Sequence, residues 1–151
     1  MNINFREITN ENWIECIRLT TNKDNKLMIF EEFVASNALS LAQSKIQDGW
    51  ITKAIYNGEK MVGFTMYGYS YEHQFYEICR LMIDYKYQKK GYGKVALLKV
   101  IEELKEIDEC KDIYLCFDPE NSMAKGLYEN AGFVDTGKII NGELLFKLTL
   151  E

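Results

Sequence analysis

The run Gln88-Lys89-Lys90-Gly91-Tyr92-Gly93-Lys94 has residue types and a spacing that suit a site for an anion. It follows an apolar stretch that ends at Ile83 and opens a segment with helical periodicity. The first N–H groups of a helix have no partner within the helix, and the helix dipole adds partial positive charge there. Glycines let the backbone approach an anion closely, so the run predicts phosphate binding. Taken alone, the glycines fit a purely structural role equally well.

Two other phosphate-binding motifs fit this run less well. Gly91-x-Gly93-x-x-Ala96 also matches the dinucleotide fingerprint, but in that fold the first strand leads directly into the first glycine. Here the segment Asp84-Tyr85-Lys86-Tyr87 intervenes. The nucleoside triphosphate loop requires Ser or Thr after its Lys, whereas Val95 follows Lys94.

Hydrophobic periodicity predicts the elements that position this run within one domain spanning residues 1–151. Strand, helix, strand in succession predicts a parallel pair with a right-handed crossover, and Asn57-Gly58 and Asn141-Gly142 predict hairpin turns. The fold class is therefore α/β with a mixed, mostly antiparallel sheet. We expect strands over 3–8, 51–56, 61–69, 74–83, 113–117, 133–140 and 143–150, and helices over 12–19, 31–47, 91–107 and 122–131.

The helix expected over 91–107 repeats apolar residues at helical spacing. Val95, Leu98, Ile101, Leu104 and Ile107 are expected to face the core.

Charge and composition restrict the class of partner. A net charge of -5 disfavours nucleic acid and suits a cationic small molecule, although it also fits a surface that is simply solubilising. The chain opens without a basic segment followed by an apolar run, and no apolar stretch reaches membrane length, so we expect a cytoplasmic protein without a membrane partner. His73 is the only histidine, and the four cysteines lack ligand spacing, so no metal is expected.

Two ordered motifs together resemble the GNAT (Gcn5-related N-acetyltransferase) superfamily over nearly the whole chain. The first is Arg80-Leu81-Met82-Ile83-Asp84 followed by Tyr87-Gln88-x-x-Gly91-x-Gly93, and the second is Asn121-x-x-Ala124-x-x-Leu127-Tyr128-x-x-x-Gly132-Phe133. The resemblance implies a sheet whose central parallel pair splays apart to admit acetyl-CoA, the cosubstrate. It implies that the main chain of Leu81, Met82 and Ile83 pairs with the pantetheine arm, and that Gln88 to Lys94 bind the pyrophosphate.

The resemblance also implies roles in catalysis. Tyr128 matches the tyrosine that protonates the departing thiolate, with packing against the sheet as its structural alternative. Asn121 is expected to cap a helix and to touch the cofactor. Relatives that act on polyamines carry a carboxylate where this chain has Cys79, so the general base is open. Glu77 lies two residues earlier on the same strand face and is the candidate base, acting through water, with a solvated surface role as its alternative.

Within the superfamily, Phe33-Val34-Ala35-x-Asn37-x-x-Ser40-Leu41-Ala42-Gln43 and Val62-Gly63-Phe64-x-Met66-Tyr67-Gly68 resemble bacterial spermine/spermidine acetyltransferases. The closing Gly137-x-x-x-x-Gly142-Glu143 fits the same branch. The resemblance implies a small-molecule polyamine acceptor, and a homodimer is compatible with it. The carboxylates expected to hold the acceptor are Glu31, Glu32, Glu72 and Glu143.

Three alternative functions remain open from the sequence. The acceptor could be a protein N-terminus, a lysine or an aminoglycoside. The chain could instead be a catalytically silent acyl-CoA sensor, or a generic nucleotide-binding domain.

Overall fold

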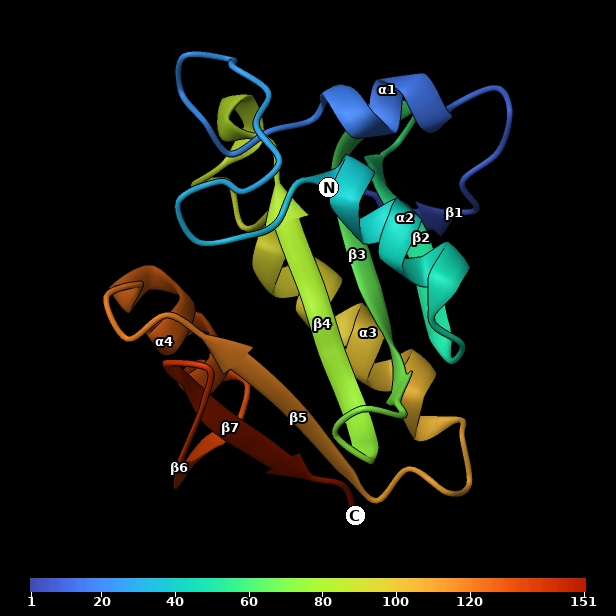
Figure 1. The fold of residues 1–151 in the computed structure, drawn as a ribbon. Helices are drawn as coiled ribbons and strands as arrows, with labels where there is room; N and C mark the ends of the chain where they lie inside the picture. Colours follow the sequence, from blue (N-terminus) through green and yellow to red (C-terminus); the bar gives the residue numbers. More distant parts are fainter.

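Seven strands form a single sheet in the order β1-β2-β3-β4-β5-β7-β6 in the computed structural model, which describes residues 1–151 (Figure 1). All neighbouring strands are antiparallel except β4 and β5, which are parallel. The predicted mixed sheet is therefore confirmed. The strands are β1 (Ile3–Arg6), β2 (Trp50–Asn57), β3 (Lys60–Ser70), β4 (Phe75–Ile83), β5 (Asp112–Phe117), β6 (Val134–Ile140) and β7 (Glu143–Thr149).

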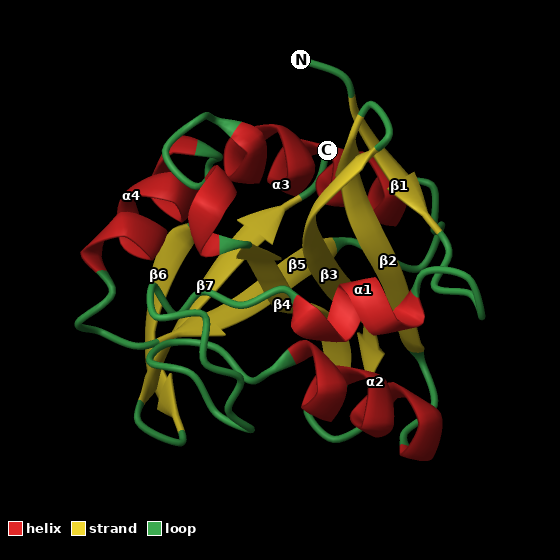
Figure 2. Ribbon diagram, turned by 90° about the horizontal axis from the view of Figure 1, so that it is seen from above, coloured by secondary structure: helices red, strands yellow, loops and turns green.

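Helices cover both faces of the sheet, α1 and α2 on one side and α3 and α4 on the other (Figure 2). Each side has its own apolar core, one around Phe64 and Met66 and the other around Val100 and Leu115. No helix is both long and apolar enough to cross a membrane. The helices are α1 (Trp13–Arg18), α2 (Asn37–Ile46), α3 (Tyr92–Lys105) and α4 (Ser122–Asn130), with a 3-10 turn η1 (Tyr85–Tyr87).

The parallel pair of β4 and β5 is short, and the two strands then diverge (Figure 1). They pair only at Tyr76 with Ile113 and at Glu77 with Tyr114. Just beyond this point β4 carries a bulge, because Ile78 and Arg80 have partners on β3 while Cys79 between them has none. A bulge bends and twists its strand. The second half of β4 therefore turns away from β5 and leaves an open edge.

The core face of α3 differs from the expected one. Ile101 and Leu104 are buried, but Val95 and Leu98 are 37% and 45% exposed. The sheet instead contacts the stripe that includes Leu97 and Val100, which has the same helical spacing. Ala96 also faces the sheet and is fully buried, because its small side chain lets the helix approach β2, β3 and β4 closely.

The helix predicted over 31–47 begins only at Asn37. The Ser36 side chain caps it by accepting a hydrogen bond from Leu39 N at 3.1 Å. Residues before the cap form a small hairpin, in which Ser36 N donates to Ile29 O and Glu31 N donates to Val34 O, each at 2.9 Å. The Glu31 carboxylate accepts the Thr21 N–H at 2.8 Å, which ties this hairpin back to the end of α1.

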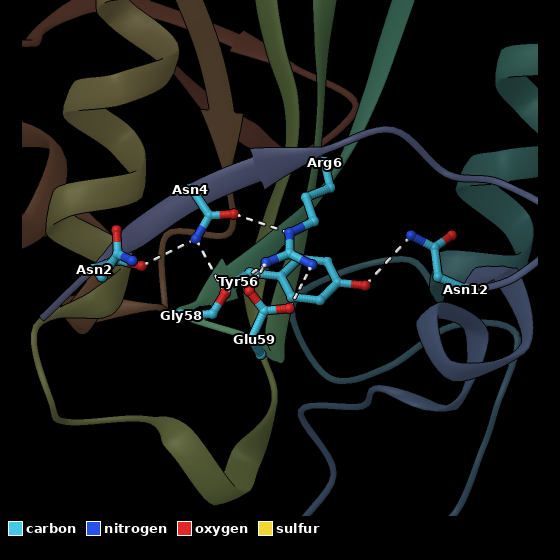
Figure 3. Close-up of polar contacts among 7 residues, drawn as sticks. All are labelled: Asn2, Asn4, Arg6, Asn12, Tyr56, Gly58 and Glu59. Atoms are coloured by element: carbon cyan, nitrogen blue, oxygen red, sulfur yellow. Dashed lines mark hydrogen bonds and ion pairs between the residues drawn. The ribbon is translucent and has the colours of Figure 1, made fainter.

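The edge strand β1 is fixed by Arg6, which lies over the β2–β3 turn (Figure 3). Its guanidinium carbon is 4.1 Å from the ring centre of Tyr56, and its Nη2 donates to Gly58 O at 2.9 Å. An ion pair to Glu59 and a bond to the Asn4 side chain complete the cluster. The strand ends there, two residues earlier than expected.

Candidate active site

A cleft of about 140 Å³ lies where β4 and β5 begin to separate. Its walls come from α2, β4, β5 and β7 and from the turns that follow β3 and β6. Three of the predicted carboxylates, Glu72, Glu77 and Glu143, line it together. Glu31 and Glu32 do not, because the first is bound to Thr20 and Thr21 and the second is exposed on the hairpin.

The carboxylates deeper in the cleft are partly removed from water. Burial raises the pKa of Glu77, and His73 and Arg80 oppose that shift. Burial also raises the pKa of the half-buried Glu143, again against the influence of Arg80. Charged carboxylates are costly in such surroundings unless cations approach them. The cleft is therefore suited to a ligand that carries positive charge.

Arg80 is the one cation that lines this cleft. Its Nη2 donates to the side-chain oxygen of Gln43 on α2 at 3.1 Å, and its Nη1 donates to Cys79 O at 2.9 Å. Its Nε is buried without a partner. The guanidinium thus joins β4 to α2 at the wall of the cleft.

Glu77 and Cys79 both line the cleft, as expected for alternate residues on one strand face. Cys116 on β5 lines it as well. Burial raises the pKa of each thiol to about 12. The thiolate is the nucleophilic form of cysteine, so neither residue is suited to form a covalent intermediate at neutral pH.

Tyr128 on α4 packs against β5, with its ring centre 5.4 Å from that of Phe117 and 6.0 Å from that of Phe133. Burial raises the pKa of its phenol to about 12, and the negative charge of Glu143 acts in the same direction. The phenol is therefore fully protonated at neutral pH. Asn121 caps α4 by accepting the Ala124 N–H at 3.1 Å, as its position predicted.

The open edge of β4 presents main-chain groups of alternate residues. Asp84 N donates to Val62 O at 2.9 Å, and in an antiparallel ladder the groups that face the neighbouring strand recur every second residue. The main chain of Met82 therefore faces β3, whereas that of Leu81 and Ile83 faces the gap. Of the three predicted residues, Leu81 and Ile83 thus have their main chain on the side of the gap.

The turn that leads into α3 contains two residues with left-handed backbone. Gly91 has φ 84° and Lys89 has φ 63°, both in the left-handed region, whereas Gly93 has no positive φ. The first N–H groups of a helix have no partner within the helix and can bind an anion. Lys89, Lys90 and Lys94 are exposed around this turn, so it suits a phosphate group. Tyr92 anchors it by accepting a hydrogen bond from Asn57 at 3.0 Å.

Sequence reasoning did not find the roles of His73, Arg80, Gln43 and Cys116 in the cleft. His73 Nδ1 lies 3.3 Å from the Glu77 carboxylate. The contact arises because the chain reverses at Gln74, whose φ is 61°. No local motif marks such a turn, although the presence of one histidine four residues before the candidate base was a signal available in the sequence.

Residues 32–133 match the acetyltransferase (GNAT) family. The chain is also 31% identical over 150 residues to the spermine/spermidine N(1)-acetyltransferase of Bacillus subtilis (strain 168), with 95% of each chain covered. The chain therefore belongs to the GNAT acetyltransferase family.

Solved structures share the fold at lower identity. The PaiA N-acetyltransferase of Thermoplasma acidophilum, solved with coenzyme A, aligns with TM-score 0.69 and 17% identity over 99% of this chain and 100% of that one. Mutant forms of the spermidine/spermine N-acetyltransferase of Vibrio cholerae align with TM-score 0.69 and 20% identity over 98% and 95%. These likenesses confirm the GNAT fold.

Proposed function

We propose that this protein transfers the acetyl group of acetyl-CoA to a primary amine of a polyamine such as spermidine or spermine. The observation that carries the proposal is the cleft at the divergence of β4 and β5, where Glu72, Glu77 and Glu143 gather. The relative from Bacillus subtilis, named for spermine and spermidine, supports the same acceptor class.

A polyamine suits this cleft because it has further ammonium groups to anchor while one amine reacts. A charge-assisted hydrogen bond contributes about 1.5–3 kcal/mol when it is shielded from water, and an exposed ion pair contributes about 1 kcal/mol or less. Glu143 is half-buried, so it would provide a stronger contact than an exposed group, and the buried Glu77 adds negative charge to the cleft. Glu72 is exposed and would act mainly by attraction at the mouth.

The residues along the gap fit acetyl-CoA. The main chain of Leu81 and the N–H of Ile83 lie on a strand edge without a neighbouring strand, which suits the amide-rich pantetheine arm. The Ile83 carbonyl on the same edge accepts a hydrogen bond from Gln88. The turn from Gln88 to Lys94, with three exposed lysines at a helix start, suits the pyrophosphate. Asn121 remains a predicted contact at the start of α4. When bound, the cosubstrate supplies an activated thioester for the amine to attack.

Direct attack by the amine is favoured over a covalent enzyme intermediate, because Cys79 and Cys116 are held as thiols. A main-chain N–H on the open edge of β4 would donate to the oxygen on which negative charge develops, an interaction that contributes on the order of 3–4 kcal/mol.

Tyr128 would then give its proton to the departing thiolate. A thiol has an ordinary pKa of about 8.5, whereas the pKa of this phenol is about 12. Proton transfer from the phenol to the thiolate is therefore unfavourable unless the phenolate that forms takes up another proton at once. The second proton that the amine nitrogen loses as it becomes an amide serves that purpose. Tyr128 therefore requires close contact with the reacting atoms.

The test is to measure release of free coenzyme A, with mass spectrometry of the product, for several acceptor classes. We expect turnover on spermidine and spermine to exceed turnover on an N-terminal peptide, a lysine peptide and an aminoglycoside. Preference for one of these last three would overturn the polyamine assignment. Tight acetyl-CoA binding without turnover on any amine would favour the silent sensor. Homodimerisation and a cytoplasmic location stay predictions from sequence.

A further inference from the structure

His73 occupies a fixed position beside the buried carboxylate of the cleft. Its Nδ1 is 3.3 Å from Glu77 Oε2, and its own main-chain N–H donates to Ser70 Oγ at 3.1 Å. The imidazole also packs against Phe75, with ring centres 5.3 Å apart. Both His73 and Glu77 line the cleft. The pair therefore has the arrangement of an imidazole oriented by a carboxylate.

We propose that His73 is the general base of the transfer reaction, with Nε2 accepting the proton of the acceptor ammonium while Glu77 orients the ring through Nδ1. This inference rests on the proposed function and deepens it. Glu77 is then a positioning residue. The imidazole of His73 takes the place of the water that was expected to link Glu77 to the substrate.

Accessibility distinguishes the two members of the pair. The side chain of His73 is 23% exposed, whereas that of Glu77 is 8% exposed. A proton that leaves the acceptor has to reach solvent, and the imidazole is the more exposed of the two groups. With Nδ1–H donated to the carboxylate, Nε2 keeps the free lone pair.

The basicity of the two groups also favours His73 over Glu77 as the general base. An alkylammonium with a pKa near 10 has to lose a proton before it attacks, and a base that exchanges protons near neutral pH does this best. Histidine is the side chain with that property, whereas an ordinary carboxylate is a much weaker base. The titratable groups that line the cleft with His73 are Glu72, Glu77, Cys79, Arg80, Cys116 and Glu143.

The proton balance of the step is complete. The N–H bond of the acceptor ammonium breaks, the electron pair stays on the amine nitrogen, and an N–H bond forms on His73 Nε2. The free amine attacks the thioester carbon, and the C–S bond breaks with transfer of the Tyr128 proton to sulfur. The amine's second proton reloads Tyr128, and His73 releases its proton to solvent. Each turnover thus yields one amide, one thiol and one proton.

The first test compares His73→Gln with the wild type across pH, using spermidine as acceptor. General base catalysis contributes roughly 10²–10⁴-fold, so we expect kcat/KM of His73→Gln at pH 7 to be lower than that of the wild type by a factor in that range. The deficit should shrink toward pH 10, where more of the acceptor is already deprotonated, and added imidazole should restore part of the rate. Tyr71→Gln, at an exposed position in the same turn, is the matched control and should keep the wild-type profile.

A loss that is equal at every pH and insensitive to imidazole, or no loss at all, would reduce His73 to a structural role.

A second test needs no acceptor. Because His73 is the only histidine, its ¹⁵N resonances report directly which ring nitrogen carries the proton in the neutral form. We expect Nδ1–H in the wild type and a shift toward Nε2–H in Glu77→Leu. An Nε2–H tautomer in the wild type would overturn the pair even if polyamines are acetylated, and failure of the polyamine assignment would leave this readout intact.

Discussion

The side-chain amide of Gln88 donates a hydrogen bond to the main-chain carbonyl of Ile83 at 3.0 Å, which ties the turn before α3 to the end of β4. One side chain thus joins the two parts of the proposed acetyl-CoA site, the strand edge and the phosphate turn. A hydrogen bond contributes about 1 kcal/mol, so we expect Gln88→Ala to weaken acetyl-CoA binding about fivefold. Isothermal titration calorimetry measures this, and an unchanged affinity would separate the turn from the cofactor site.

The left-handed backbone of Gly91 leads to a second prediction. An L-residue in this conformation costs roughly 1–2 kcal/mol, so Gly91→Ala should lower both thermal stability and affinity for acetyl-CoA. Gly137 has φ 79°, close to the 84° of Gly91, and has open space around it in β6. Gly137→Ala should therefore lower stability similarly while leaving the affinity unchanged. Equal affinities of the two variants would argue against a phosphate site at Gly91.

Tyr128→Phe removes one hydroxyl from a ring that otherwise keeps its packing on Phe117 and Phe133. We expect an unchanged fold and unchanged acetyl-CoA affinity, with kcat lowered by roughly 10²–10⁴-fold because the thiolate departs without its proton. Single-turnover kinetics with a polyamine measures the chemical step directly. Tyr71→Phe is the control, and a Tyr128→Phe protein with wild-type kcat would leave the tyrosine with a packing role only.

Glu77 is predicted to lower stability in exchange for function. Its pKa is raised in the folded protein, so the folded state binds the proton more tightly than the unfolded state does. Stability then falls as the pH rises from the ordinary value of 4.5 through the raised one, and the loss persists at neutral pH. Glu77→Gln should therefore raise the Tm at pH 7, with the gain disappearing below pH 4.5. Thermal unfolding at several pH values tests this, and a lower Tm at pH 7 would contradict it.

Sequence reasoning succeeded where a local pattern determines the structure. The parallel pair follows from strand, helix and strand in succession, and the two hairpins follow from Asn57-Gly58 and Asn141-Gly142. The predictions from sequence were wrong where contacts between residues far apart in the chain determine the structure. The helix before Asn37 is replaced by a hairpin because Glu31 binds Thr20 and Thr21, and α3 buries Leu97 rather than Leu98 because two apolar stripes overlap on it.

The residues of the candidate site also fall into those that a local motif predicts and those that contacts between distant segments bring together. Tyr128 was assigned by a motif, whereas the contact of His73 with Glu77 depends on a tight turn and the pair of Arg80 with Gln43 joins a strand to a helix. Such contacts depend on how elements meet, and no spacing in the sequence records them.

The most direct test of the account is the ratio of kcat/KM for spermidine to that for a monoamine of similar pKa, measured at low and raised salt. We predict a ratio well above one that falls as salt screens the cleft, and that drops about tenfold or more in Glu143→Gln, since a shielded charge-assisted bond contributes about 1.5–3 kcal/mol. Glu109→Gln makes the same change in net charge at an exposed position outside the cleft and should leave the ratio unchanged. A ratio near one, or a ratio that neither salt nor Glu143→Gln alters, would contradict the acidic cleft as the polyamine site.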